Sequence, residues 1–138
     1  MKINAYLMFD GQCEEAFNFY AQCLGGKLEL MRFAEAPDNV CGEFPAEYQQ
    51  RIMHACLTLG DQLLMASDSA PPHVYEGIKG CSIALNVDSV AEGERLFAAL
   101  AEQGQVQMPM QATFWAAGFG MLVDRFGVSW MVNCEKNE

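Results

Sequence analysis

An internal repeat constrains the fold of this chain more than any other feature of its sequence. The order strand, helix, strand, long loop, strand, turn, strand is expected twice within 138 residues. The two copies align at an offset of about 77 residues near their first strands and about 66 near their last strands. A half of this size buries too little surface to be comfortably stable by itself. The repeat therefore predicts an α+β fold of two βαβββ modules that together form one curved mixed β-sheet.

The first module is predicted within residues 1–70. A strand over 2–9 precedes a helix over 12–24, which ends at Gly25 and Gly26 because glycine supplies a left-handed C-cap. The helix is inferred from apolar side chains at the helical period, namely Cys13, Ala16, Phe17, Tyr20 and Leu24. The remaining expected elements are strands over 27–33, 52–59 and 62–66, and a long loop over 34–51.

The second module is predicted within residues 80–138, after a Pro-rich linker at 69–80. Ser89 and Glu92 have the spacing of a capping box at the start of a helix over 90–103. The other expected elements are strands over 81–87 and 106–110, a helix cap at Gly104, an aromatic loop, and two final strands joined by a turn at 124–127.

Composition narrows the range of partners. The formal net charge of −10 disfavours binding to nucleic acids and to anionic membranes, because both are polyanions. No apolar run has the length of a membrane span, and the N-terminus does not resemble a secretory signal. We therefore expect a cytoplasmic protein. None of the six cysteines forms a C-x-x-C pair, so reduced and mostly buried thiols are expected.

Several stretches of the chain resemble one known family. They are YLMFDG at 6–11, LGG at 24–26, LMASD at 64–68, TFW at 113–115, DRFGV at 124–128 and WMVN at 130–133. These motifs resemble the PhnB-like, or 3-demethylubiquinone 3-methyltransferase-like, branch of the vicinal oxygen chelate superfamily. That superfamily includes glyoxalase I, bleomycin resistance proteins and extradiol dioxygenases. The resemblance covers nearly the whole chain and implies the glyoxalase/bleomycin resistance fold, in which the curved mixed β-sheet forms a cup.

The resemblance also allows a test for a metal site. Superfamily enzymes hold one divalent metal ion in the cup, with His or Glu ligands from the first and last strands of each module. The corresponding positions in this chain are Ala5, Met65, Ser82 and Met131, and none is a good ligand for a hard divalent ion. Shifts of two residues, which keep the same sheet face, add no histidine or carboxylate. We therefore expect no metal ligands and no cofactor.

The cup is instead expected to be an apolar pocket for a small molecule. Its predicted lining residues are Leu7, His54, Met65, Ser82, Ala84, Phe114, Trp115 and Met131. Met65 and Met131 can equally be read as core-filling side chains. Trp130 is expected in the core, because it neighbours Met131 and successive strand residues face opposite sides. The family resemblance further implies a homodimer.

His54 is the candidate catalytic residue, because histidine exchanges protons near neutral pH. Cys56 lies on the same strand face, but a Cys–His arrangement also needs a group that orients the histidine, and the sequence indicates none. A semi-buried, hydrogen-bonded histidine is the simpler interpretation. Asp68 and Asp124 lie beside turns and are expected to accept backbone hydrogen bonds.

Two functional classes remain open. The first is a metal-free protein that binds a small apolar or aromatic molecule, comparable with sequestering resistance proteins. The second is a lyase, isomerase or dioxygenase-type enzyme with an atypical metal site and His54 as acid/base. Methyl transfer is not supported, because the only G-x-G, at 118–120, does not stand between a strand and a helix.

Overall fold

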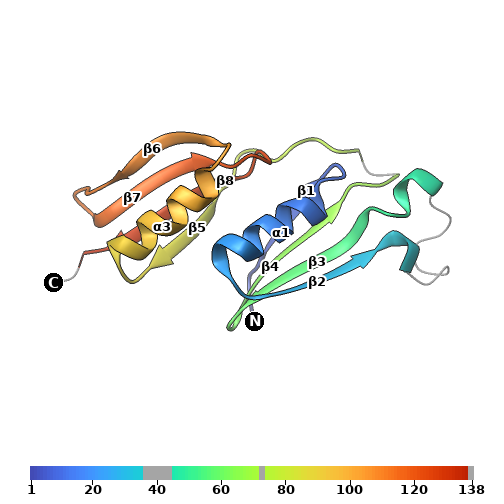
Figure 1. Ribbon diagram of the computed structural model, residues 1–138, viewed down its shortest axis with the longest axis horizontal. Helices are drawn as coiled ribbons and strands as arrows, with labels where there is room; N and C mark the ends of the chain where they lie inside the picture. Colours follow the sequence, from blue (N-terminus) through green and yellow to red (C-terminus); the bar gives the residue numbers. More distant parts are fainter. Residues whose placement is uncertain (36–44, 72–73, 137–138) are drawn as a thin grey trace. The chain divides into compact units, whose positions relative to one another are not determined.

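Two βαβββ units make up the chain (Figure 1). The computed structural model describes residues 1–35, 45–71 and 74–136. The chain divides into compact units of residues 1–77 and 78–138, termed module 1 and module 2 below. The predicted α+β class and the repeat of the βαβββ unit are confirmed. Residues 36–44, which are half of the expected long loop and include Cys41, and residue His73 lie outside the described residues.

Module 1 forms a four-stranded mixed sheet with the strand order β1-β4-β3-β2. β1 is parallel to β4, whereas β3 is antiparallel to both β4 and β2. The elements are β1 (Ala5–Phe9), α1 (Cys13–Leu24), β2 (Lys27–Arg32), the 3-10 turns η1 (Phe33–Glu35) and η2 (Ala46–Tyr48), β3 (Ile52–Leu59) and β4 (Gln62–Asp68).

Module 2 repeats this topology, with the strand order β5-β8-β7-β6 and β5 parallel to β8. The elements are β5 (Ile83–Val87), α3 (Val90–Ala101), β6 (Gln105–Gln111), β7 (Ala116–Val123) and β8 (Ser129–Glu135). Each module therefore has its own sheet of four strands, in place of the one continuous sheet that the repeat suggested.

Each helix packs on one face of the sheet in its own module (Figure 1). In module 1 the buried face of α1 contains Phe17, whose ring meets that of Phe9 edge-on at 6.3 Å between centroids. In module 2 a side chain at Gly93 of α3 would touch Val87 and Val132. These contacts identify the helix-covered face of each sheet, and the opposite face is termed the open face below.

A glycine immediately precedes the second strand of each module, where the main chain of the neighbouring strand passes very close. A Cβ atom at Gly26 would lie 2.5 Å from the Thr58 carbonyl oxygen, and one at Gly104 would lie 2.4 Å from that of Val123. α1 ends at Gly25, as expected, but with a φ of 80° and a ψ of −157° this residue does not form the left-handed helical cap that was predicted. Gly104 was expected to cap α3, but the residue with positive φ there is Gln103, at 61°. Gly104 is needed for space rather than for a left-handed backbone.

Membrane insertion through a helix finds no support. Within residues 1–35, 45–71 and 74–136, no helix is both long and apolar enough to cross a bilayer.

Candidate functional site

The open face of module 1 begins with the alternation of β1. Leu7 and Phe9 are buried at 5% and 1% exposure, on the side that faces α1. Successive strand residues point to opposite faces, so Tyr6 and Met8, which are both exposed, project from the open face. The expectation that Leu7 lines a pocket is therefore wrong. Tyr6 occupies the position on the open face that was predicted for Leu7.

The register between strands shows which side chains share this open face. Met65 of β4 pairs with Tyr6 on one side and with Cys56 of β3 on the other. The neighbouring cross-strand pair is His54 with Met31 of β2. The open face of module 1 thus carries Tyr6, Met31, His54, Cys56 and Met65, which are at most half-buried.

His54 has a specific partner on this face. The Tyr6 hydroxyl lies 3.2 Å from His54 Nδ1, and the two ring centroids are 5.9 Å apart. Burial raises the pKa of the Tyr6 phenol, the nearby Cys13 thiol raises it further, and a hydrogen bond with the Ser67 side chain lowers it in part. The phenol therefore stays protonated at neutral pH, where it can donate a hydrogen bond to the imidazole or accept one from it.

Tyr6 is the site residue that sequence reasoning missed. The alternation of β1 with Phe9 on the helix side would have placed Tyr6 outward. What the sequence does not indicate is the parallel pairing of β1 with β4, which brings a residue of the first strand within reach of β3.

The positions that hold a metal ion in superfamily enzymes can now be tested by register. Ala5 pairs with the buried Leu64 and lies on the helix-covered face, so its assignment from the sequence is wrong by one residue. The outward positions in module 1 are Tyr6 and Met65. In module 2 they are Ala84 and Met131, which pair with each other, whereas Ser82, which was assigned from the sequence, lies before β5. A phenol, two thioethers and a methyl group do not fit a hard divalent ion.

The open face of module 2 carries hydroxyl, amide and thioether groups. Ser82 Oγ and Ser129 Oγ are 2.8 Å apart, and Met131 pairs with both Ala84 and Met121. Asn133 donates a hydrogen bond through Nδ2 to Asn86 Oδ1 at 3.3 Å. Its own Oδ1 is buried and has no donor among the described residues.

Three aromatic rings line the start of β7. Phe114 and Trp115 are 88% and 48% exposed, with their rings packed edge-on at 4.8 Å between centroids. Trp115 packs in the same manner on Phe119 at 5.3 Å, and Phe119 pairs with Asn133 across the strands. Both rings of this pair are accessible, and their predicted role as pocket-wall residues remains a prediction.

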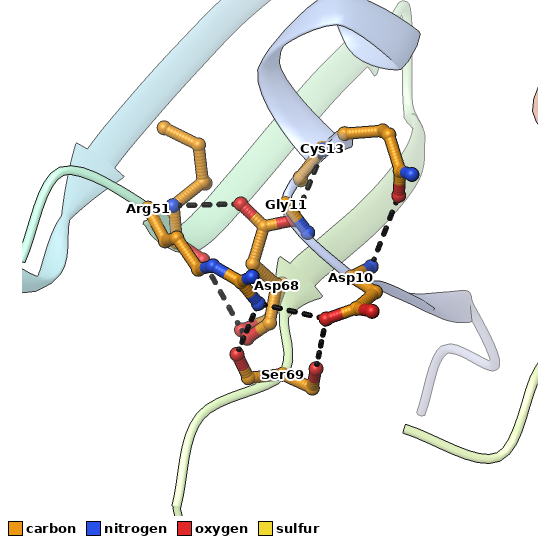
Figure 2. A network of polar contacts seen from close by, with 9 residues as sticks. Asp10, Gly11, Cys13, Arg51, Asp68 and Ser69 are labelled. Atoms are coloured by element: carbon orange, nitrogen blue, oxygen red, sulfur yellow. Dashed lines mark hydrogen bonds and ion pairs between the residues drawn. The ribbon is translucent and has the colours of Figure 1, made fainter. Parts of the chain in front are cut away.

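Asp68 organises the polar network of module 1 (Figure 2). Its Oδ1 accepts hydrogen bonds from the backbone N–H groups of Gly11 at 2.8 Å and Cys13 at 3.0 Å, and its Oδ2 accepts one from Ile52 at 2.9 Å. Asp68 is buried and lies at the end of β4. The expected backbone hydrogen bonds of Asp68 are confirmed, and they hold the start of α1 rather than a turn.

Asp124 has the corresponding role in the last turn of module 2. Its Oδ1 accepts from the N–H groups of Phe126 at 2.8 Å and Val128 at 3.0 Å. Its Oδ2 accepts from Trp130 Nε1 at 2.8 Å. Trp130 is fully buried, so its expected place in the core is confirmed.

A pocket of about 370 Å³ lies at one end of module 1. It is lined by Asp10, Tyr48, Ser69, Ala70, Pro71, Val74 and Tyr75. The adjacent Arg51 donates from Nη1 to Asp10 Oδ1 at 2.9 Å and to the Ser69 carbonyl at 3.2 Å (Figure 2). Its guanidinium also lies 4.8 Å from the Tyr48 ring centroid. The charged groups at this pocket thus already have partners within the protein.

The described cysteines differ in their exposure to solvent. Cys13, Cys23 and Cys134 are buried, Cys56 is half-buried and Cys81 is exposed. Burial raises the pKa of the Cys13 thiol far above its usual range, and the negative charges of Asp68 and Glu14 raise it further. Cys13 is therefore an inert thiol, as expected for a small buried side chain. Cys81 precedes β5 and does not lie in the strand that was predicted for it.

The fold defines a class of protein. A glyoxylase/bleomycin resistance protein/dioxygenase domain from Frankia sp. EAN1pec superposes with a TM-score of 0.67 over 99% of this chain and 93% of that one, at 11% identity. At such low identity the similarity concerns the fold alone, and it confirms the expected glyoxalase/bleomycin resistance fold.

Sequence comparison then gives the family. Residues 1–133 match the family 3-demethylubiquinone-9 3-methyltransferase, and the chain belongs to that family. Protein YjdN of Escherichia coli is 34% identical over 145 residues, covering 100% of this chain and 98% of YjdN. Protein PA1353 from Pseudomonas aeruginosa is 59% identical, with a TM-score of 0.89 and coverage of 99% of both chains. The PhnB protein from Bacillus cereus is 29% identical, with a TM-score of 0.74 over 97% of this chain and 99% of that one.

Proposed function

We propose that this protein binds a small apolar or aromatic molecule on its open sheet faces without the help of a metal ion. The observation that carries the proposal is the exposure of Phe114 and Trp115, which lie edge-on against each other. Large apolar side chains that stay in contact with water and gather on one surface mark a binding site for an apolar partner. Aromatic rings contribute both buried area and edge-to-face contacts to such binding.

The composition of both open faces supports this choice of ligand. Module 1 contributes Tyr6, Met8 and Met31, which are exposed. Module 2 contributes Met121 and Met131, which pair across β7 and β8. Thioethers adapt their shape to different apolar ligands, because the methionine side chain is flexible and polarisable.

The methyl transfer in the family's name is not part of the proposal. Gly118 and Gly120, which form the only G-x-G, lie within β7 and not at a strand-to-helix turn. A Cβ atom at Gly120 would lie 2.7 Å from the Phe97 ring of α3, and one at Gly118 would lie 3.2 Å from Met110. These glycines make room for the packing of module 2, which accounts for them without a nucleotide-type cofactor.

A pair of naphthalene probes tests the proposal. We expect 2-methoxynaphthalene and 2-naphthol to raise the melting temperature of the protein and to change its tryptophan fluorescence in a saturable way. Trp115→Ala should weaken binding, because it removes half of the exposed ring pair. Val106→Ala is the matched control, since Val106 is similarly exposed but pairs with the fully buried Leu122. Equal affinity of both variants and the parent, or no saturable binding at all, would contradict the proposal.

A second candidate function is acid/base catalysis by His54. The observation that favours it is the 3.2 Å contact between the Tyr6 hydroxyl and His54 Nδ1, because an oriented imidazole is the group that a proton-transfer site requires. A lyase or isomerase would remove a proton from carbon next to a carbonyl group. Deuterium exchange from solvent into a panel of enolisable ketones and aldehydes, followed by NMR, tests this. Exchange that His54→Gln abolishes supports it, and exchange unchanged in His54→Gln contradicts it.

We also propose that a second copy of the chain covers part of the open surface, giving a homodimer. The exposed aromatic and sulfur-containing side chains support such an interface. Sedimentation equilibrium over a range of protein concentrations tests it, and a monomer at all concentrations would refute it.

A further inference from the structure

The centre of the open face of module 1 brings three potential metal donors together. Cys56 and Met65 are direct cross-strand partners in β3 and β4, the two inner strands of the sheet. His54 precedes Cys56 by two residues, so its side chain emerges from the same face. All three residues are half-buried, which keeps them partly accessible.

The strand geometry places these donors within reach of one ion. Directly opposed residues have Cβ atoms about 4.5–5.5 Å apart, and diagonal neighbours about 7–8 Å. Cys56 and Met65 form the direct pair, and His54 is diagonal to Met65. The flexible thioether and the imidazole can close the remaining gap by rotating about their side-chain bonds.

The donor set selects a soft metal. Thiolate and thioether sulfurs prefer Cu(I), whereas hard divalent ions prefer carboxylates and other oxygen donors. Among the described residues, no three His, Cys, Asp or Glu side chains gather in a way that could hold an ion. Glu29, which pairs with Cys56 from β2, lies 3.3 Å from the Lys27 ammonium. The carboxylate opposite Cys56 in β2 is thus already engaged in an ion pair.

Tyr6 provides the outer support that such a site needs. A histidine that ligates a metal through one ring nitrogen usually donates the other N–H to a fixed acceptor. The Tyr6 oxygen, 3.2 Å from His54 Nδ1, can accept that hydrogen bond and leave the Nε2 lone pair for the ion.

We propose that Cys56, Met65 and His54 bind one Cu(I) ion on the open face of module 1. Cys56 binds as the thiolate and releases its proton to solvent, while His54 and Met65 bind as neutral ligands, so the copper keeps its oxidation state. The net charge of −10 favours the approach of a cation. Copper binding at this site does not require the organic ligand proposed above, although Tyr6 contributes to both.

Cu(I) titration under anaerobic conditions, in competition with bicinchoninate, tests the site. The parent for all measurements is Cys41→Ser/Cys81→Ser, which removes the exposed thiol and the one outside the described residues; the other three thiols are buried. We expect one Cu(I) per chain. Cys56→Ser should weaken binding by more than about 100-fold and Tyr6→Phe by about 10-fold, the lower end of what losing a partner behind a ligating histidine costs.

Methionine variants supply the matched control. Met65→Leu keeps the side-chain volume and removes the sulfur, so it should weaken Cu(I) binding while the protein stays folded. Met110→Leu makes the same change on the helix-covered face, near Gly93 and Gly120, and should leave binding unchanged. The comparison of Met65→Leu with Met110→Leu also tests the copper site if Cys56→Ser does not fold. The proposal is overturned if the parent cannot compete for Cu(I), if Met65→Leu binds as the parent does, or if Zn(II) is held more tightly than Cu(I).

Discussion

Modules 1 and 2 have the same strand order but hold the starts of their helices differently. α3 begins with Ser89, whose side chain accepts a hydrogen bond from Glu92 N at 3.1 Å. α1 begins after Gln12, which makes no such bond, and Asp68 of β4 caps it instead. At the place in β8 where β4 has Asp68, module 2 has Cys134, since both residues pair with the last residue of the first strand. One helix start is thus local in sequence and the other depends on tertiary structure.

The open faces differ as well. Module 1 presents groups that can exchange a proton or bind a metal, namely Tyr6, His54 and Cys56, around Met65. Module 2 presents the Asn86–Asn133 amide pair, methionines and the Phe114–Trp115 rings. The repeated scaffold therefore does not imply repeated chemistry, and experiments that change one module at a time can separate their contributions.

The largest expected effect on stability comes from Trp130, and Trp115 in the same module provides the contrast. Trp130→Ala should destabilise the protein by about 3–5 kcal/mol, because it leaves a core cavity and removes the donor to Asp124 Oδ2. Trp115→Ala removes a half-exposed ring and should change stability by less than about 0.5 kcal/mol. Urea unfolding of both variants measures the difference. Similar losses would mean that Trp115 is also a core residue.

The second prediction tests the difference between the two helix starts by removing the side chain that caps each of them. Asp68→Ala leaves three backbone N–H groups without their acceptor, and we expect a loss of about 3 kcal/mol in the free energy of unfolding. Ser89→Ala removes one local cap and should cost about 1 kcal/mol. Urea denaturation compares the two. If Ser89→Ala were the more damaging change, the distinction between local and tertiary caps would not hold.

Gly26 and Gly104 test a steric constraint that both modules share, namely the close approach of a carbonyl oxygen to the glycine before the second strand. Gly26→Ala and Gly104→Ala each force a Cβ atom against a carbonyl oxygen and should cost about 1–3 kcal/mol. Gly26 should be the more sensitive, since its φ of 90° adds backbone strain. Gly25→Ala is the control, because its φ is 80° but no atom lies within 4 Å of the added methyl group. Thermal unfolding that ranks Gly25→Ala as the most harmful would contradict the steric account.

The smallest effect concerns alkaline pH. Burial raises the pKa of Cys13 above the unfolded value of 9.0, so its contribution to stability is complete below pH 9 and is lost as the pH rises further. Tyr6 has a raised pKa of the same sign, above an unfolded value of 10.0. Unfolding under reducing conditions at pH 7 and pH 10.5 should therefore show a smaller loss of stability for Cys13→Ala than for the parent. An equal loss of stability in both proteins would exclude Cys13 as a source of the pH dependence.

The sequence predicted the scaffold well because its signals are local. The apolar period of α1, the Ser89 cap and the 124–127 turn each lie within a few neighbouring residues, and all three are present in the structure. Boundaries shifted where pairing decides them: β1 starts at Ala5 instead of residue 2, and β4 continues to Asp68 instead of ending at 66. Gly104 does follow α3, but it was predicted as a helix cap. Glycine is needed there because the Val123 carbonyl group of another strand leaves no room for a side chain.

The candidate site was predicted only in part. The outward positions of Met65 and Met131 follow from strand alternation, which the sequence contains. The face of β1 was assigned incorrectly, and Leu7 and Ala5 were placed outward in error. A shift of one residue exchanges the two faces of a strand, so a small uncertainty in register reverses the assignment of every side chain.

The sequence alone thus determined the order of elements, the repeat, the family and the residue types available for chemistry. Only the tertiary structure decided that Tyr6 meets His54 and that Asp68 caps α1. Both contacts join β1 or the start of α1 to strands about 50 residues later in the chain, through the parallel pairing of β1 with β4. Hydrogen bonds between parallel strands leave no local pattern in sequence, because the partners are brought together only when the helix between them has packed on the sheet.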